Sequence, residues 1–329
     1  MAKKRRIMQQ PGLFPLEWRP PTTRDIARAV RDVGLAGLPA PDPRANHATY
    51  QEIRCRSALN RVKGMPFEWA LNPYRGCTHA CHYCYARKYQ RHMELGAGDD
   101  FSTAIFVKVN LVEVLKRELS RATWRRDQVA VGTATDPYQP VEGEYALTRG
   151  ALEQLALART PVGLVTKGPM VVRDIDVLQS LTAAARCTIY VSVPSTSEDA
   201  WRKLEPGTAH PVQRLKAVRR LADAGVRACV LMAPLLPGIT TSREAIFSTV
   251  KAIADHGATA VGASLVRLDA GTREHFLAVL TVEYPHLVEG YERLFAQSSA
   301  RAPRDYAAAV QRVVHDAMAM AGMRDPYVP

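Results

Sequence analysis

The sequence lacks the features of a membrane-spanning or exported protein. No apolar run in its 329 residues approaches the roughly 20 residues that a membrane-spanning helix needs. The basic start, Met1–Arg6, is followed by residues 7–12, which do not form the apolar segment that a signal peptide would carry. These two absences predict a cytoplasmic protein.

Cysteine is also scarce, with six in the whole chain, and half of them fall within eight residues. Cys77, Cys81 and Cys84 are spaced C-x3-C-x2-C. Three neighbouring cysteines cannot pair evenly, so a disulfide framework is not expected in a protein without an export signal. Thiolates at this density usually hold a metal centre, and three ligands on a four-iron cube would leave one iron open to a small molecule.

A zinc knuckle is the alternative for this loop, with His79 or His82 as the fourth ligand. No second ligand pair follows at the spacing typical of zinc fingers, which favours the iron–sulfur interpretation. On that interpretation His79 and His82 lie beside the metal centre or at the surface of the protein.

The composition is that of a globular protein, with 47% of the residues hydrophobic and 23% charged. A chain of this length can bury a large core. The net charge of +12 would favour a polyanion such as nucleic acid as a partner. Many of the arginines fall on predicted helix faces, where a solvated surface is the ordinary explanation. The charge therefore suggests nucleic acid without requiring it.

Short apolar runs alternate with amphipathic helices from about residue 67 onward. The runs predict strands at residues 67–71, 103–109, 128–133, 162–166, 187–193, 226–233 and 258–266. Helices are predicted at 111–119, with Asn110 as the N-cap, and at 147–158, 172–184, 211–224 and 242–256. This alternation is typical of an α/β fold with a parallel sheet. Six or seven units fit an incomplete TIM-like barrel, since a full barrel takes about 250 residues.

The rest of the chain is predicted to form two appendages to this barrel. Residues 1–60, rich in Pro and Arg, form an extended arm with one short helix at 23–33. Residues 61–270 form the partial barrel. Residues 271–329 form a helical extension that closes its open side and ends in a helix at 304–320. Cys187 and Cys229 fall inside strand runs and are expected in the core.

Polar clusters follow four of the predicted strands, where the chemistry of such barrels is found. The hydroxyls and the carboxylate of residues 133–136 suit a cationic amine, Lys167 suits a carboxylate, and Ser192 suits a ribose. The rigid apolar turn at 234–238 suits the flank of an adenine. Turn formation, solvation and helix capping are the ordinary explanations for such residues.

The three-cysteine loop, with Tyr83 directly before the last cysteine, resembles the signature of the radical SAM superfamily. Further segments resemble the spore photoproduct lyase-like branch of that superfamily, often called DNA repair photolyase-like. Within the branch, the chain is most similar to an actinobacterial-type group of unassigned reaction. The matching segments are Asn60–Val62, Trp69–Arg87, Thr133–Glu142, Thr166–Gly168, Ser192–Pro194, Glu205–Gly207 with Arg214, and Pro234–Gly238.

The resemblance implies that Cys77, Cys81 and Cys84 ligate a [4Fe-4S] cluster whose open iron binds S-adenosylmethionine. Glu205 and Arg214 are expected to form an ion pair beneath this cofactor, with an ordinary surface pair as the alternative. The implied cofactor-binding residues are Tyr83 at the adenine, Thr133, Thr135 and Asp136 near the methionine amino group, Lys167 at the methionine carboxylate, and Ser192 at the ribose.

The implied activity is reductive cleavage of S-adenosylmethionine to methionine and a 5'-deoxyadenosyl radical. The radical then abstracts hydrogen from a substrate that the sequence does not identify. The low cluster potential that this needs implies a reductant such as a flavodoxin or a ferredoxin. The rival hypothesis is a nucleic-acid-binding iron–sulfur or zinc protein without catalysis, which the net charge and the basic start motivate.

The chain departs from the resemblance at the hydrogen donor. Spore photoproduct lyase itself uses a cysteine beyond the cluster, and no cysteine here lies in a segment that matches it. Tyr138 and Tyr145 are candidates for a hydrogen-atom relay, and Cys55 would reach the site if the arm folds over it. The residue that acts on the substrate is therefore unknown, and thymine-dimer repair is not implied.

Overall fold

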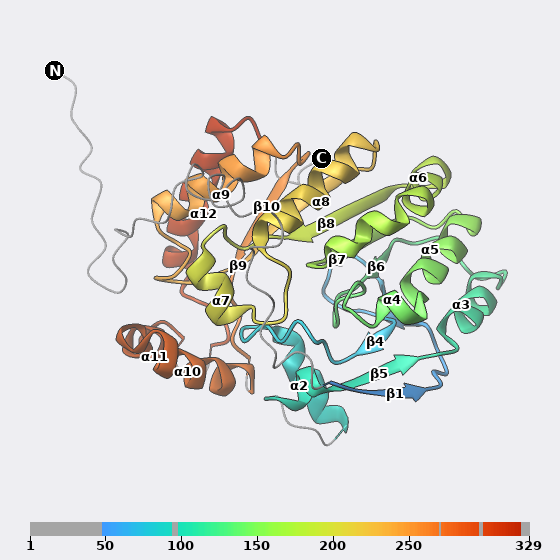
Figure 1. Cartoon of the computed structure of the whole chain (residues 1–329), viewed down its shortest axis with the longest axis horizontal. Helices are drawn as coiled ribbons and strands as arrows, with labels where there is room; N and C mark the ends of the chain where they lie inside the picture. Colours follow the sequence, from blue (N-terminus) through green and yellow to red (C-terminus); the bar gives the residue numbers. More distant parts are fainter. Residues whose placement is uncertain (1–47, 94–97, 270, 296–298, 324–329) are drawn as a thin grey trace.

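The computed structural model describes residues 48–93, 98–269, 271–295 and 299–323 (Figure 1). The helix predicted at 23–33 lies outside these residues. Within them, four short strands come first, and helices and strands then alternate along the chain until a final group of helices. No helix in the described residues is both long and apolar enough to cross a bilayer.

Seven strands form the central sheet, in the order β10-β9-β8-β7-β6-β3-β2. They are β2 (Leu59–Arg61), β3 (Trp69–Leu71), β6 (Val129–Val131), β7 (Val162–Thr166), β8 (Cys187–Ser192), β9 (Ala228–Leu235) and β10 (Val261–Leu265). β3 and β6 to β10 run parallel, and β2 is antiparallel to β3. Because β2 and β10 are edges that do not pair with each other, the sheet is an incomplete barrel, which confirms the predicted fold class.

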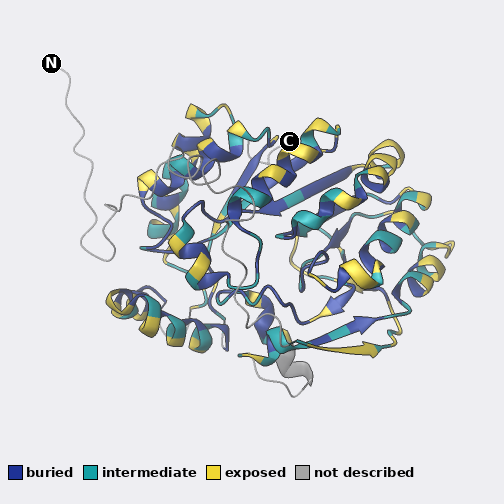
Figure 2. Ribbon diagram, in the orientation of Figure 1, coloured by how far each residue is buried: buried dark blue, intermediate teal, exposed yellow. Residues whose placement is uncertain are grey.

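Helices pack on the outside of this sheet, and their buried sides face it (Figure 2). The longer ones are α3 (Leu111–Leu119), α5 (Leu147–Leu157), α6 (Ile175–Ala184), α8 (Pro211–Asp223), α9 (Arg243–Asp255) and α12 (Arg304–Met320). Shorter elements are η3 (Tyr85–Met93), α2 (Asp100–Thr103), α4 (Glu142–Tyr145), η4 (Pro169–Asp174) and α7 (Glu198–Leu204). The predicted long helices are therefore confirmed to within a few residues at each end.

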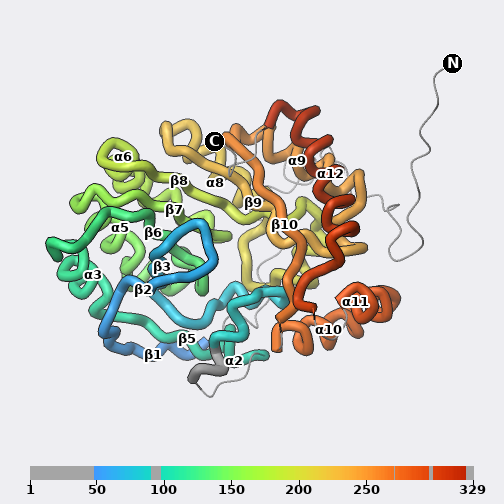
Figure 3. Tube along the Cα trace, turned by 180° about the vertical axis from the view of Figure 1, so that it is seen from behind, coloured from blue at the N-terminus to red at the C-terminus, as the bar shows by residue number. Residues whose placement is uncertain are grey.

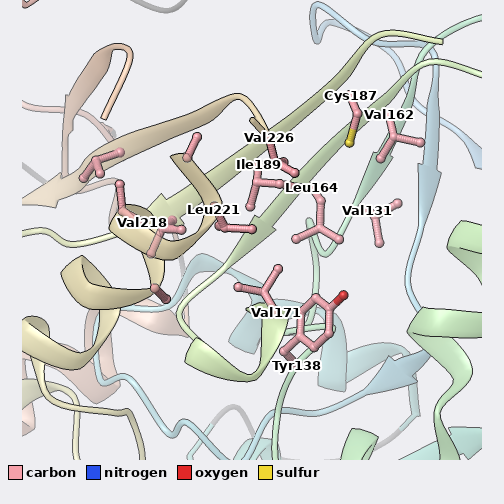
Figure 4. Close-up of a cluster of buried hydrophobic side chains, with 14 of the residues drawn as sticks. Val131, Tyr138, Val162, Leu164, Val171, Cys187, Ile189, Val218, Leu221 and Val226 are labelled. Carbon is pink, nitrogen blue, oxygen red and sulfur yellow. The ribbon is translucent and has the colours of Figure 1, made fainter. Parts of the chain in front are cut away.

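The core lies between the sheet and this helical layer. Val131, Leu164 and Ile189, from three neighbouring strands, share an apolar cluster with Leu221 of α8 (Figure 4). All three residues of β6 are buried, as are five of the six in β8. Strands covered on both faces must be apolar throughout, which explains the near-continuous hydrophobic runs in the sequence.

Local signals explain where several helices begin and end. Ser242 accepts a hydrogen bond at its Oγ from the N–H of Ala245 at 3.1 Å and so caps α9. Gly225 follows α8 with φ of +73°, a conformation that favours glycine. Asn110 stands at the N-cap of α3, as predicted, but its side chain makes no capping bond to the helix. Its Oδ1 instead accepts from the N–H of Cys55 at 2.8 Å, and its Nδ2 donates to the Cys55 carbonyl at 3.0 Å.

A second sheet, of three strands, lies beside the barrel in the order β1-β5-β4. It contains β1 (Thr49–Ile53), β4 (Tyr74–Arg75) and β5 (Ala104–Lys108). The run at 103–109 is thus a strand, but its prediction as a barrel strand is wrong. β5 pairs with β1 and β4 only. Along its first four residues buried and partly buried positions alternate, which fits a strand covered mainly on one face.

The final helices are α10 (Thr272–Glu283), η5 (Pro285–Leu287), α11 (Val288–Leu294) and α12. α12 packs along α9 and β10, at one edge of the barrel sheet (Figure 3). α10 and α11 build a separate apolar cluster around Phe276, Leu280 and Tyr291. This cluster also includes Cys81 and Tyr83, so the C-terminal helices reach the three-cysteine loop.

Candidate cofactor site

The three-cysteine loop lies between β4 and η3. Cys77, Cys81 and Cys84 are all unpaired thiols; the first two are buried and the third is partly buried. We call residues 76–84 the cysteine loop. The cysteine loop lies outside the helices and strands, and hydrogen bonds to distant parts of the chain set its conformation.

Backbone groups of the cysteine loop are held by two distant segments. The N–H of Cys77 donates to the Phe101 carbonyl at 2.8 Å. The N–H of His82 donates to the Leu204 carbonyl at 3.0 Å, and the carbonyl of His79 accepts from the N–H of Gly207 at 3.1 Å. The loop is therefore fixed by the segment before β5 and by both sides of the turn that follows α7.

Gln139 and Thr135 add side-chain support from the turn after β6. The N–H of Thr78 donates to Oε1 of Gln139 at 3.1 Å. The Gly76 carbonyl accepts from the Thr135 hydroxyl at 2.5 Å and from Nε2 of Gln139 at 3.3 Å. Gln139 is fully buried. The sequence alone assigned Gln139 no role. A local pattern does not show that the side-chain amide of a residue in this turn bonds a loop much earlier in the chain.

Two glycines are required by the close packing around the loop. A Cβ on Gly76 would lie 2.6 Å from the Ala104 carbonyl oxygen, and the residue has φ of +74°. A Cβ on Gly207 would lie 2.1 Å from the Thr78 carbonyl oxygen. Both positions therefore exclude any other residue without movement of the backbone.

Arg87 is a buried cation directly behind the loop. Its Nε donates to the Cys81 carbonyl at 3.0 Å, and one of its terminal nitrogens donates to the Ala80 carbonyl at 2.8 Å. Its guanidinium also lies over the Phe101 ring, 5.0 Å from the ring centre. Arg87 thus orders the loop between the first two cysteines and places a positive charge near the thiols. Its role was not assigned from the sequence.

The electrostatics of the thiols fit a cationic metal centre. Burial raises the pKa of all three, to about 12 for Cys81. The negative charge of Asp136, and then those of the other two thiolates, raise the pKa of Cys77 further, and Glu205 and Cys84 raise the pKa of Cys81. A bound cluster would supply the positive charge that three neighbouring thiolates need.

The donor set also distinguishes a cluster from a single ion. In the part of the chain that the structure describes, no three His, Cys, Asp or Glu side chains gather closely enough for one metal ion. An iron–sulfur cube is held differently, because each thiolate binds its own iron. Three unpaired thiols in one loop, each able to bind its own iron, fit such a cube.

A buried group of polar side chains lies next to the loop. Lys167, directly after β7, places its Nζ 2.6 Å from Oγ of Ser192 at the end of β8. The same Nζ lies 3.1 Å from Oε1 of Glu205 and 5.6 Å from the ring centre of Tyr83. Glu205 also accepts hydrogen bonds from the Tyr83 hydroxyl and from the Arg214 guanidinium. The structure thus brings together five residues that the sequence singled out from five separate segments.

The Glu205–Arg214 ion pair is confirmed, and it is buried rather than at the surface. Burial alone would raise the pKa of Glu205, but the positive charges of Arg214 and Lys167 hold that pKa well below its usual range. Arg214 also donates to the Ser192 carbonyl at 2.9 Å. A buried charge pair with this many hydrogen bonds holds its neighbours in one arrangement.

Asp136 occupies the centre of the turn after β6. Its Oδ1 accepts from the Thr166 hydroxyl at 2.7 Å, and its Oδ2 accepts from the N–H of Lys167 at 2.6 Å. Nδ1 of His79 lies 3.2 Å from Oδ2, outside hydrogen-bond alignment. Burial would raise the pKa of Asp136, but His79 and these hydrogen bonds hold it below its usual value. Asp136 thus joins the cysteine loop to the end of β7.

Thr133 lies at the same edge and is only partly buried. Its carbonyl accepts from the Tyr85 hydroxyl, and its own hydroxyl lies 3.5 Å from Nδ2 of Asn72. Of the three residues expected near an amino group, Thr133 is the one whose side chain is least engaged by protein partners.

A small pocket opens beside Tyr83 and Glu205. Its other lining residues come from the ends of β8 and β9 and from α7, and they are Pro194, Ser195, Ser197, Ala200, Trp201, Leu236 and Thr240. The surface that lines this small pocket is mostly apolar.

The candidate relay residues and the remaining cysteines lie elsewhere. The Tyr138 hydroxyl is buried and donates to Oδ2 of Asp174 at 3.0 Å. The Tyr145 hydroxyl donates to Glu52 of β1 at 3.0 Å. Cys187 and Cys229 are buried, as predicted. Cys55 is partly buried against the barrel core, with its backbone bound to the Asn110 side chain.

Comparison with known proteins agrees with this site. Residues 71–250, more than half of the chain, match the Radical SAM superfamily domain. An uncharacterised protein of Mycobacterium tuberculosis is 38% identical over 256 residues, which are 77% of this chain and 75% of that protein. An uncharacterised protein of Methanocaldococcus jannaschii is 23% identical over 188 residues, 57% of this chain and 68% of that protein.

Solved structures of spore photoproduct lyase share the fold. The enzyme complexed with dinucleoside spore photoproduct superposes with a TM-score of 0.65 at 18% identity, over 89% of this chain and 87% of that one. A mutant with bound AdoMet and the same dinucleoside gives 0.65 at 17% identity over the same shares of the two chains. From the domain match and the relative of 38% identity it follows that this chain is an enzyme of the radical SAM superfamily, whose cofactors are a [4Fe-4S] cluster and S-adenosylmethionine.

Proposed function

We propose that Cys77, Cys81 and Cys84 ligate the [4Fe-4S] cluster of this enzyme. The observation that carries the proposal is the arrangement of three unpaired thiols in one loop, most of whose other polar groups are bonded to protein. Arg87 behind the loop supplies a positive charge to the thiolates. His79 and His82 bond or pack against protein partners, which supports their place beside the cluster rather than on it.

We propose that S-adenosylmethionine binds between the cysteine loop and the ends of β7, β8 and β9. Lys167 binds the methionine carboxylate, since it follows β7 directly and its Nζ lies 5.6 Å from the ring centre of Tyr83 in the cysteine loop. Ser192, which Lys167 and Arg214 hold in place, binds the ribose. The small pocket takes the adenine between the Tyr83 ring and Leu236.

The amino group of the methionine is assigned to the turn after β6. Thr133 contacts it directly, because its hydroxyl is the one least engaged by protein. Thr135 and Asp136 shape this part of the site from behind. Thr135 holds the Gly76 carbonyl, and Asp136 fixes the backbone of Lys167.

When bound, the two cofactors supply one-electron cleavage of the sulfonium, which gives methionine and a 5'-deoxyadenosyl radical that abstracts hydrogen from the substrate. The chain's own residues bind, orient and exclude water. Lys167 neutralises the carboxylate, and the Glu205–Arg214 pair fixes the Tyr83 ring against the pocket. The apolar walls of the pocket keep water from the reacting atoms.

A radical SAM enzyme needs a reductant, and we propose a flavodoxin or a ferredoxin in the cytoplasm for this role. Nucleic acid is the first substrate class to test. The net charge of +12 supports it, as does a fold shared with an enzyme whose structure holds a dinucleoside. Membership of the superfamily favours the enzyme over the rival hypothesis of a binding protein without catalysis.

The test of the ligand assignment is iron content after anaerobic reconstitution. The wild type is expected to hold about four irons per chain, as a cube requires. Replacing Cys77, Cys81 or Cys84 by Ala should abolish the cluster, whereas Cys55→Ala should leave it intact. A cluster of unchanged iron content and spectrum in any one of the three variants would remove that cysteine from the ligand set.

A further inference from the structure

Helix α10 is tied to the cysteine loop and to η3 by three polar contacts. Nδ1 of His82, between the last two cysteines, lies 3.0 Å from Nε2 of His275. The Thr272 hydroxyl donates to the Cys84 carbonyl at 3.4 Å. Three residues before α10, Asp269 pairs its Oδ2 with Nζ of Lys88 in η3 at 2.7 Å.

Apolar contacts run along the same side of α10. Phe276 and Leu280 are fully buried and belong to the same hydrophobic cluster as Cys81 and Tyr83. They stand four residues apart, so they lie on one face of the helix. This face and the three polar contacts together make α10 one wall of the cysteine loop (Figure 1).

The histidine pair constrains the loop more than an apolar contact would. Two facing ring nitrogens need one N–H and one lone pair, so the two rings must take complementary tautomers and keep their orientation for the bond to form. The two rings lie with their centres 5.2 Å apart and tilted by 36°. Because His82 is flanked by Cys81 and Cys84, holding its ring also holds the backbone that carries both of them.

The opposite side of the loop is fixed by buried groups, whereas the α10 side is not fully buried. Cys77 and Cys81 are buried, but Cys84, His82 and His275 are only partly so. A chelator or oxidant in solution would therefore approach the cysteine loop from the α10 side.

We propose that α10 is a latch on the metal centre, and that His275, acting through His82, is a positioning residue that slows release of the cluster. The proposal rests on the assignment of Cys77, Cys81 and Cys84 as cluster ligands. On this account the C-terminal helices do more than cover the barrel, because they determine how long the cluster survives exposure to solvent.

The test uses the reconstituted holoenzyme and measures the rate at which an iron chelator removes the cluster under anaerobic conditions. His275→Ala should release iron about tenfold faster than the wild type, which matches the lower end of the loss in metal affinity when a supporting group is removed. His275→Gln keeps a side chain that can hydrogen-bond to His82 and should restore part of the lost protection. His286→Ala, at an exposed histidine of the same extension, should match the wild type.

A second variant tests the latch if His275→Ala does not fold. Asp269→Asn removes the charge that pairs with Lys88 and should also speed release several-fold. Release at the wild-type rate in both variants would overturn the latch. A wild type that holds no cluster would instead overturn the ligand assignment, so the two failures can be told apart.

A general loss of stability is distinguished by thermal unfolding of the chain before reconstitution. The latch predicts unfolding midpoints for His275→Ala and His286→Ala that are close to each other, with only the rates of iron release differing. A midpoint that falls for His275→Ala, together with a release rate restored equally by Gln and by Phe at this position, would show simple packing and contradict the latch.

Discussion

Gly207 packs its backbone directly on the cysteine loop: its N–H donates to the His79 carbonyl at 3.1 Å, and an added Cβ would lie 2.1 Å from the Thr78 carbonyl oxygen. The turn after α7 and the loop that carries the thiols are therefore in backbone contact. A backbone atom cannot move aside as a side chain can. A single methyl group added at Gly207 would therefore have to displace the backbone of the cysteine loop.

Gly207→Ala should displace the cysteine loop and lower the iron content after reconstitution. We expect a loss of stability of about 1–3 kcal/mol, which is typical of overpacking at a site that cannot relax. Iron analysis and urea unfolding measure the two effects. Gly143→Ala is the matched control, since its Cβ would meet only the Met170 side chain, at 3.7 Å. Full iron content in Gly207→Ala would show that the loop tolerates the shift.

Arg87→Met should destabilise the protein and impair cluster assembly. The substitution leaves the buried carbonyls of Ala80 and Cys81 without their guanidinium donor, and each such loss costs about 1–3 kcal/mol. Urea unfolding should therefore show a loss of roughly 2 kcal/mol or more. Arg117→Met removes an exposed arginine and should change stability by less than about 0.5 kcal/mol. Equal effects of the two substitutions would count against a structural role for Arg87.

Lys167→Ala should weaken S-adenosylmethionine binding while the cluster remains. A hydrogen bond to a charged group contributes about 1.5–3 kcal/mol, so the Kd should rise by roughly tenfold to a hundredfold. Binding is measured by calorimetry on the reconstituted protein, with iron content as the internal check. Lys203→Ala, which removes a lysine paired with Asp199 on α7, is the control. An unchanged Kd in Lys167→Ala would refute the carboxylate role.

Lys108 should make stability depend on pH in the alkaline range. Burial, together with the positive charge of Arg75, lowers its pKa from 10.5 to about 8. The unfolded chain then binds more protons than the folded one between these values, so stability rises with pH across this window. The full shift corresponds to about 3 kcal/mol.

Unfolding by urea at pH 8 and pH 10 checks this pH dependence. The wild type should gain about 2 kcal/mol relative to Lys108→Met between the two conditions. The substitution also removes the hydrogen bond from Lys108 to the Asn72 carbonyl. The comparison uses only the change in unfolding free energy with pH, so this loss does not enter it directly. Parallel pH profiles of the two proteins would mean that Lys108 titrates normally.

Much of the fold follows from local patterns. Apolar runs alternating with amphipathic helices predicted the parallel barrel and its long helices, because these features depend on neighbours in the sequence. The position of β5 outside the barrel could not be predicted from local patterns. Its pairing with β1 and β4 depends on the path that the chain takes through the cysteine loop. The role of the Asn110 side chain did not follow either, because it bonds the distant backbone of Cys55 instead of capping its own helix.

The residues of the site likewise divide into those that local sequence patterns predict and those that they do not. Polar residues at the ends of strands, such as Lys167 just after β7 and Ser192 at the end of β8, converge because parallel strands end at one edge of the sheet. Gln139 and Gly207 act through contacts between distant segments, and no periodicity or spacing marks such contacts. His275 was also missed, since a single histidine on a helix carries no signal of the partner that it faces.

The measurement that tests the central claim most directly is the formation of 5'-deoxyadenosine by the reconstituted protein, given dithionite and S-adenosylmethionine under anaerobic conditions. The account predicts that the wild type forms it, in the presence of cell extract if the substrate must trigger cleavage, and that Cys81→Ala does not. An intact, reduced cluster that yields no 5'-deoxyadenosine with or without extract would contradict the account, as would formation by Cys81→Ala.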